Sequence, residues 1–280
     1  MARRLRTTIV CLISLTLIAS CTPLNTRGSS VRPAAVLGVS SSDVAGLEEG
    51  LTQAASQEIE GVKFTSGRIA GRPVVVAWTG VGKVNAAMVA TLLIEHFQPT
   101  QVIHTGIAGG VDPNLEPGDI VIAKQTAHHD MGYIGPEGFE AGGVRNRLTE
   151  ENNPTFFPAD PNLLAVAERA AGGTSFDPIA HRNGQRPPHV VVGTVVTGDT
   201  FVASKTKCQE LAETLQAGAV DMEAAAVAQI CHQRGVPHLV LRSIADKADE
   251  SAVVDKQKFY SLAAENAVRL VVAILRSMGT

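Results

Sequence analysis

Residues 220–226 read VDMEAAA and residues 241–249 read LRSIADKAD, and each is an apolar run that ends abruptly in carboxylates. Such a run is typical of a buried strand, so we expect Glu223 and Asp246 where two central strands end. In an open α/β sheet, ligands bind in the crevice outside the strand ends. Two acids delivered to one crevice can carry out acid catalysis and polar recognition of a small molecule.

Strand-like and helical segments alternate along most of the chain, which predicts a sheet with helices on both faces. Segments 62–69 and 73–78 form an early hairpin. The predicted fold class is therefore α/β, a three-layer αβα architecture with a mixed, largely parallel central sheet. The stretch 126–158 is irregular, and so long a loop is usually functional or mobile. The other predicted strands are 33–39, 101–105, 118–123, 190–196, 219–221 and 238–243, and the predicted helices are 44–54, 83–97, 162–171, 205–216, 223–234 and 256–277.

The N-terminus has the pattern of an export signal. Arg3, Arg4 and Arg6 precede the uncharged apolar run 7–19, which is too short for a comfortable permanent membrane span. The run leads into Cys21 after small residues, which resembles the bacterial lipobox, where the Cys is lipidated. Ordinary secretion is the alternative, but only lipidation gives the Cys a role. We expect an exported, membrane-anchored lipoprotein of a bacterial cell envelope, with a signal peptide at 1–21, a flexible tether at 22–32 and one domain at 33–280.

Charge and composition argue against nucleic acid as a partner. The net charge of −3 comes without a basic stripe, and aromatic residues make up only 4% of the chain, too few for base-stacking surfaces.

Cys208 and Cys231 are the cysteines left in the mature domain, and they lack CxxC spacing. We expect both to be unpaired thiols on the core side of helices.

Several motifs are weak signals when taken singly. The stretch 80–83, Gly-Val-Gly-Lys, is either an anion site at a helix N-terminus or a simple tight turn. Glycines in 106–110 let a backbone approach a ligand closely. His128, His129 and Asp130 are metal-ligand types, but adjacent histidines on a strand point oppositely, so we expect surface or loop-anchoring roles and no metal.

The two acids also have ordinary explanations when taken singly. Glu223 is equally well explained as a first-turn acid that stabilises a helix dipole. Asp246 is otherwise an N-cap, or an ion-pair partner of Arg242 or Lys247.

Six motifs taken in order remove this ambiguity. They resemble the nucleoside phosphorylase family, and within it most closely the 5′-methylthioadenosine/S-adenosylhomocysteine nucleosidases, over nearly all of residues 34–277. One such motif alone would be weak, whereas six in order are specific. The motifs are 80–87, 105–110, 118–121, 197–201, 220–224 and 242–249.

The resemblance implies a role for each site residue. Glu223 would accept hydrogen bonds from the ribose hydroxyls, and Met222 would pack on the apolar face of the sugar. Phe201 would stack on adenine, and the backbone of Val202 would meet its Watson–Crick edge. Asp246 would donate a proton to purine N7 as the glycosidic bond breaks. The other predicted substrate-binding residues are Ile107, Ala108, Gly109 and Asp221.

The resemblance also implies attack by water with a carboxylate as base, as in inverting glycoside hydrolysis. The nucleosidases carry a Glu at the position of Asp43, which is one methylene shorter and is otherwise explained as a helix cap. Ile107 stands where the family often has Ser, which makes the pocket drier. Both departures concern the rate of catalysis more than the identity of the ligand.

Hydrolysis is favoured over phosphorolysis because a phosphate site needs charge-assisted donors. Residues 39–44 and 105–112 contain no Arg or Lys. The predicted activity is hydrolysis of 5′-modified adenosines to adenine and free sugar, with no cofactor and no metal. The resemblance implies a homodimer. The alternatives are a phosphate-dependent purine nucleoside phosphorylase and a catalytically weak nucleoside-binding lipoprotein.

Overall fold

The structure is a computed structural model that describes residues 31–181 and 184–278. Its strands are β1 (Ala34–Gly38), β2 (Thr52–Ile59), β3 (Val62–Ile69), β4 (Arg72–Trp78), β5 (Gln101–Gly110), β6 (Ile120–His128), β7 (Gly132–Gly135), β8 (Gly138–Ala141), β9 (Phe156–Pro158), β10 (Ile179–His181), β11 (Gly184–Arg186), β12 (Val190–Thr197), β13 (Ala217–Asp221) and β14 (His238–Asp246). Its helices are α1 (Ser41–Glu49), α2 (Lys83–Phe97), α3 (Pro161–Gly173), α4 (Lys205–Leu215), α5 (Ala224–Arg234) and α6 (Ala252–Ser277).

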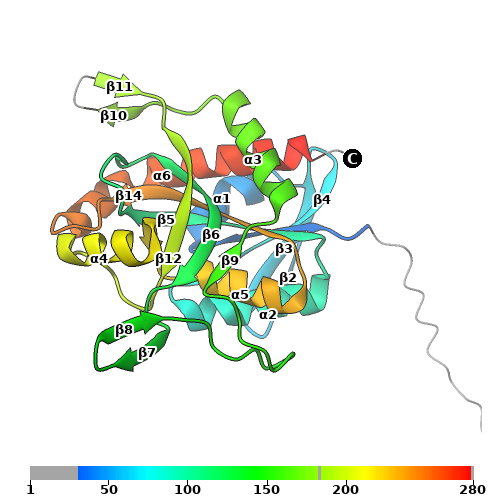
Figure 1. The fold of residues 1–280 in the computed structure, drawn as a ribbon. Coiled ribbons are helices and arrows are strands. Elements are labelled where there is room, and N and C mark those ends of the chain that lie inside the picture. The colour runs from blue at the N-terminus through cyan, green and yellow to red at the C-terminus, as the bar shows by residue number, and fades with distance from the viewer. Residues whose placement is uncertain (1–30, 182–183, 279–280) are drawn as a thin grey trace, which may run out of the picture. The chain divides into compact units, whose positions relative to one another are not determined.

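One large mixed sheet organises the domain, with the strand order β13-β12-β6-β14-β5-β1-β4-β3-β2 (Figure 1). Strand β1 runs parallel to its neighbours β4 and β5, and β14 runs parallel to β5. The β3–β4 pair is antiparallel, which confirms the predicted hairpin. Strand β13 also pairs with β5, with Ala219 opposite Gly110 and Val220 opposite Gly109. This seam closes β13, β12, β6, β14 and β5 into a ring.

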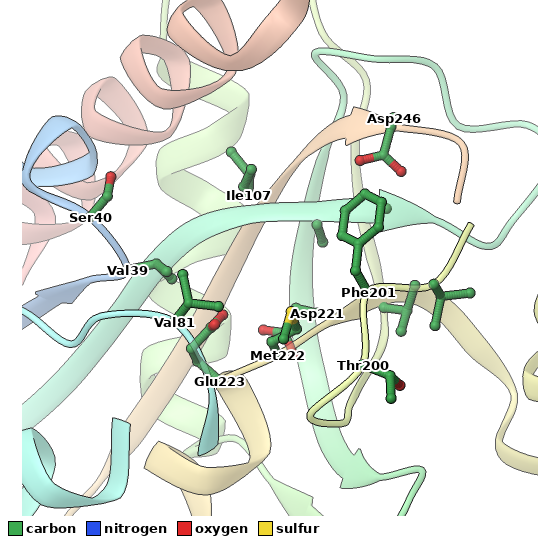
Figure 2. A pocket seen from close by; sticks show the side chains of 14 residues that line it. Val39, Ser40, Val81, Ile107, Thr200, Phe201, Asp221, Met222, Glu223 and Asp246 are labelled. Carbon is green, nitrogen blue, oxygen red and sulfur yellow. The ribbon is translucent and has the colours of Figure 1, made fainter. Parts of the chain in front are cut away.

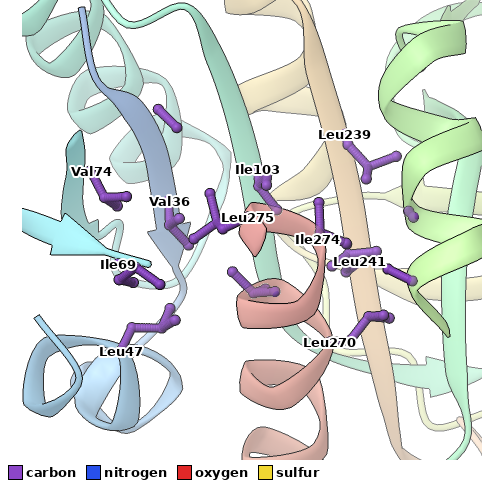
Figure 3. Packing of buried hydrophobic residues seen from close by; sticks show 14 of the residues in the cluster. Val36, Leu47, Ile69, Val74, Ile103, Leu239, Leu241, Leu270, Ile274 and Leu275 are labelled. Atoms are coloured by element: carbon purple, nitrogen blue, oxygen red, sulfur yellow. The ribbon is translucent and has the colours of Figure 1, made fainter. Parts of the chain in front are cut away.

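Helices cover both faces of the sheet, which confirms the predicted three-layer αβα class (Figure 1). Along β1, Ala34 and Val36 pack toward α1, α3 and α6, whereas Ala35 and Leu37 pack toward α2 and α5. Because both faces are buried, β1 reads as a continuous apolar run. Figure 3 shows the core on the α6 side, which includes Val36, Leu47, Ile69, Val74, Ile103, Leu239, Leu241, Leu270, Ile274 and Leu275.

The largest error of the sequence prediction is the missed edge strand β2. Residues 50–54 are predicted to be helical, but α1 ends at Glu49 and the chain then pairs with β3. Strand β2 has the sequence TQAASQEI and is almost entirely exposed. An edge strand without a buried face has no apolar alternation, so its sequence carries no strand signal.

Other elements differ from the prediction mainly in length. Strand β5 continues through the glycines to Gly110, and β14 continues to Asp246. The stretch 126–158 is irregular apart from the end of β6 and the short strands β7, β8 and β9. The small β10–β11 hairpin was not predicted.

Cys208 in α4 and Cys231 in α5 are free and buried, as expected. Within residues 31–181 and 184–278, no helix combines the length and apolar character that a membrane crossing requires. The predicted signal peptide, Cys21 and nearly all of the predicted tether lie outside the described residues.

Candidate active site

A pocket lies where the last residues of β5, β13 and β14 meet the loop before α2 and the loop after β12 (Figure 2). Glu223 and Asp246, which are 23 positions apart in the chain, both line it. Every predicted site residue except Asp43 lines this pocket. The lining residues are Val39, Ser40, Val81, Ile107, Ala108, Gly109, Thr200, Phe201, Val202, Val220, Asp221, Met222, Glu223 and Asp246.

Glu223 stands at the N-terminus of α5 and is only 3% exposed. Its Oε1 accepts a hydrogen bond of 2.9 Å from the backbone N–H of Gly82, which has φ 95°. Glycine adopts this conformation readily, so the 80–83 turn can aim an N–H at the carboxylate. Burial, with the neighbouring Asp221 carboxylate, raises the pKa of Glu223 to about 7. The group therefore changes between a hydrogen-bond acceptor and a neutral acid near neutral pH.

Asp221 belongs to a buried network directly behind Glu223. Its Oδ2 accepts hydrogen bonds from Arg242 Nε at 2.7 Å and from the Ala224 backbone N–H at 3.0 Å. Its Oδ1 accepts a hydrogen bond of 2.5 Å from the Thr197 hydroxyl. The Asp221 side chain is 1% exposed. The carboxylate thus holds the first turn of α5 in place, while Asp221 also lines the pocket, so its predicted contact with the substrate stays a prediction.

Asp246 reaches the pocket through an irregularity at the end of β14. The β14–β5 register shifts between Ile244 and Asp246, which brings Asp246 opposite Gly109. Its Oδ1 accepts a 2.8 Å hydrogen bond from the Ala248 backbone N–H. A Cβ at Gly109 would lie 2.8 Å from both Asp246 Oδ1 and Ala248 Cβ. Only glycine leaves room here for the carboxyl group. Nearby, Arg242 forms an ion pair with Asp221, and Lys247 forms one with Glu116.

The loop after β12 places Phe201 and Val202 on the pocket. Phe201 is 45% exposed, whereas Val202 is buried. The loop is held at its start by Asp199, whose backbone N–H donates to Asp130 at 2.8 Å. Lys83 joins the same cluster through a 2.6 Å ion pair with Asp130 and a 2.7 Å backbone hydrogen bond to Asp199. An aromatic ring on an anchored loop offers a stacking surface for a flat ligand.

Asp43 is the predicted site residue that does not line the pocket. Its Oδ2 accepts hydrogen bonds from the Ser40 backbone N–H at 2.7 Å and from the Ser40 hydroxyl at 2.9 Å. The bond from the Ser40 backbone N–H is one half of the capping box of α1, and in the other half the Ser40 side chain accepts from the Asp43 backbone N–H. The alternative role of Asp43 as a helix cap is therefore observed. Ser40 itself lines the pocket, which leaves Asp43 one hydrogen bond behind its wall.

Sequence reasoning missed several lining residues, namely Val39, Ser40, Val81, Thr200 and Val220. They flank predicted motifs, since Val39 and Ser40 follow the first strand and Thr200 precedes Phe201. The register of the loops decides which of these side chains turn inward. Local sequence does not carry that register.

The His128, His129 and Asp130 triplet serves the structure around the pocket. His128 Nε2 lies 3.0 Å from Gln229 Oε1, and Asp130 holds Lys83 as described above. Burial lowers the pKa of both histidines. Among the described residues, no group of three or more His, Cys, Asp or Glu side chains could hold a metal ion.

Residues 33–276 match the sequence pattern of a family described as the phosphorylase superfamily. This chain belongs to the phosphorylase superfamily. Two curated members of the superfamily are both 5′-methylthioadenosine/S-adenosylhomocysteine nucleosidases. The protein of Shewanella halifaxensis is 33% identical over 87% of this chain and 98% of its own length. The protein of Bacillus thuringiensis is 36% identical over the same shares.

Solved structures of the superfamily have the same architecture. The Neisseria meningitidis 5′-methylthioadenosine/S-adenosylhomocysteine nucleosidase, in complex with methylthio-immucillin-A, matches with a TM-score of 0.77 and 33% identity over 89% of this chain and 100% of its own. The futalosine hydrolase of Helicobacter pylori matches with a TM-score of 0.75 and 26% identity over 89% of this chain and 99% of its own. The likeness to these solved structures thus covers 89% of this chain.

Proposed function

We propose that this protein is a nucleosidase that hydrolyses the N-glycosidic bond of 5′-modified adenosines and releases adenine and the free sugar. The candidate substrates are 5′-methylthioadenosine, S-adenosylhomocysteine and 5′-deoxyadenosine. The observation that carries the proposal is the single pocket lined by both Glu223 and Asp246. Relatives that act as nucleosidases, at 33–36% identity over nearly their full length, support it.

In this proposal, the purine lies between Phe201 and Asp246. The Phe201 ring stacks on adenine, and backbone groups of Val202 meet its Watson–Crick edge. Asp246 donates a proton to N7, so that adenine leaves as a neutral base. The Ala248 N–H that binds Asp246 Oδ1 supports this role because it fixes the orientation of the carboxyl group.

The sugar lies toward Glu223 and Met222. The ionised Glu223 accepts hydrogen bonds from the ribose hydroxyls, while Met222 packs on the apolar face of the ring. Positive charge develops on the sugar as the bond to adenine breaks, and a nearby carboxylate stabilises it.

Water attacks the sugar from the face opposite adenine, with Asp43 as the base. The hydrogen bond from the Ser40 hydroxyl to Asp43 supports a proton path from the pocket wall to this carboxylate. Among the described residues that line the pocket, none is Arg or Lys, so phosphate has no charged donor there. Water is therefore favoured as the nucleophile.

The proposal extends to assembly and location. Trp78, Val81, Val84 and Met88 are large exposed apolar residues around the start of α2, and they support a homodimer interface close to the pocket. The lipobox-like sequence before Cys21 supports lipidation and a bacterial cell-envelope location. Light scattering of the purified protein tests the dimer. Incorporation of labelled fatty acid into wild type but not into Cys21→Ser tests the anchor.

Adenine release from 5′-methylthioadenosine, with and without phosphate, tests the activity. We expect phosphate-independent release that collapses in Asp246→Asn while the circular dichroism spectrum stays unchanged. Strict phosphate dependence would identify a phosphorylase. Calorimetric binding of the nucleoside without turnover over hours would identify a binding protein.

A further inference from the structure

The end of the domain away from the pocket carries exposed arginines, which we term the arginine edge: Arg32, Arg68, Arg169 and Arg276. Within residues 31–181 and 184–278, none of these four forms a salt bridge. Arg32 donates to the Gln98 carbonyl at 2.6 Å, and Arg68 donates to the Gly71 carbonyl. Carbonyl acceptors orient a guanidinium without neutralising its charge.

Met278, two residues after Arg276, connects the end of α6 to the starts of β4 and β5. The Met278 carbonyl accepts a hydrogen bond from Arg72, at the start of β4. Gln101, at the start of β5, donates to the Met278 sulfur at 3.0 Å. The neighbouring Thr100 N–H donates to the Pro33 carbonyl at 2.9 Å. The starts of β4 and β5, the end of α6 and the first residues of the domain therefore meet at this edge.

The arginine edge includes an open groove between α3 and α6. Arg169 and Arg276 line it, together with the small polar residues Thr174, Ser175 and Ser277. Arg269 also lines the groove but is paired with Asp177 at 2.5 Å. Guanidinium groups beside an apolar strip suit a phosphate that is joined to an apolar body. The apolar residues that line the groove are Ala170, Val268, Val272 and Ala273.

The pocket lies at the opposite end of the same strands. Strand β5 runs from Gln101, at the arginine edge, to Gly109, beside Asp246. Eight steps along a strand separate the two ends by roughly 25 Å. The pocket end carries acids, with Glu223 and Asp246 inside the pocket and Asp199 exposed near it. The four arginines, which form no ion pair among the described residues, therefore lie away from the pocket that holds Glu223 and Asp246.

We propose that the arginine edge docks this domain on an anionic phospholipid bilayer, with the pocket facing away from the membrane. The inference rests on the lipid anchor in the proposed function. Eleven residues, 22–32, separate Cys21 from Pro33, so the covalent chain can reach at most roughly 40 Å. That tether would join the domain at Pro33, beside the arginine edge. Attraction to a charged surface acts within about 8 Å at physiological ionic strength, so the edge nearest the anchor decides the orientation.

Binding to vesicles tests the inference without the anchor. Residues 31–280 are suitable because the relatives consist almost entirely of the matching domain. The probes are vesicles of pure phosphatidylcholine and vesicles that also contain phosphatidylglycerol, measured by co-sedimentation at low and physiological salt. We expect binding only to the anionic vesicles, and weaker binding as salt increases. The triple variant Arg68→Gln, Arg169→Gln, Arg276→Gln is expected to bind about a hundredfold more weakly, at about fivefold for each arginine.

The matched control is Arg145→Gln, Arg147→Gln, Lys205→Gln, which removes the same net charge from exposed residues elsewhere. It is expected to keep most of the binding. An equal loss in both triple variants would overturn the inference, because net charge alone would then explain binding. Failure of the wild type to bind, or stronger capture by soluble polyglutamate, would overturn it too. Adenine release in the same samples reports the nucleosidase activity separately, and we expect it to be unchanged in both variants.

Discussion

Asp221→Asn is the substitution that tests most directly how the buried network controls the pocket. The pKa of Glu223 is raised from an ordinary value of 4.5 to about 7. Burial is the largest cause of this rise and the Asp221 charge is the next. Asparagine keeps the shape of the side chain but removes that charge. Arg242 then remains nearby as an uncompensated cation, which lowers the pKa of Glu223 further.

The expected result is a shift of the pH profile. If the ribose needs the ionised Glu223, kcat/KM of the wild type falls about tenfold for each pH unit below 7. In Asp221→Asn, this acid limb should move toward lower pH by about one to two units. The measurement is adenine release from 5′-methylthioadenosine between pH 4.5 and 8.5. Glu223→Gln serves as the control, since it removes the titrating group and should flatten the limb.

The pH dependence of protein stability also reports the raised pKa of Glu223. Because the folded pKa of Glu223 is raised, the folded state holds its proton more tightly than the unfolded chain. The wild type therefore loses up to ~3 kcal/mol of stability from this group as pH rises from about 4.5 to 7. Asp221→Asn leaves Arg242 buried without its partner, which costs about 3–5 kcal/mol. Assays at low temperature on protein shown to be folded separate the two effects. A folded variant whose acid limb does not move would refute this account of Asp221.

Other substitutions test the pocket more locally. Gly109→Ala should lower kcat at least tenfold with little change in fold, because the new Cβ would lie 2.8 Å from Asp246 Oδ1. The assay is adenine release. An unchanged kcat would mean that Asp246 tolerates displacement. Asp43→Asn should reduce kcat about a hundredfold if Asp43 is the base, and Asp43→Glu should raise the wild-type rate. A purely structural cap would instead show itself as a loss of about 1 kcal/mol in thermal unfolding, with kcat retained.

The site could be predicted from sequence where an acidic residue directly follows a buried strand. Glu223 and Asp246 each follow a buried apolar run, so their meeting in one pocket follows from the topology of an α/β sheet. The role of Asp221 could not be predicted in this way. Its partner Arg242 lies 21 residues later on another strand, and only the packed structure brings the two charges together.

The fold, too, could be predicted from the sequence only where burial leaves a pattern in it. Strand β1 was predicted because both of its faces are buried, and its apolar run is therefore continuous. Strand β2 was missed because it is exposed and its pairing with β3 depends on backbone hydrogen bonds, which any sequence can make. The inward direction of Ser40 was missed because the capping box of α1 sets it after folding.

The seam between β5 and β13 couples folding to catalytic competence. It pairs Gly109, the neighbour of Asp246, with Val220, which leads into Glu223, and these strands are more than a hundred residues apart in the chain. Such distant pairing is slow to form, so the residues proposed to bind the base and those proposed to bind the sugar are brought together only late in folding. A chain with this seam open would keep most of its helices and strands yet bind no nucleoside. Amide exchange at Gly109 and Val220 should therefore lose protection at the same denaturant concentration that abolishes turnover, ahead of the loss of secondary structure.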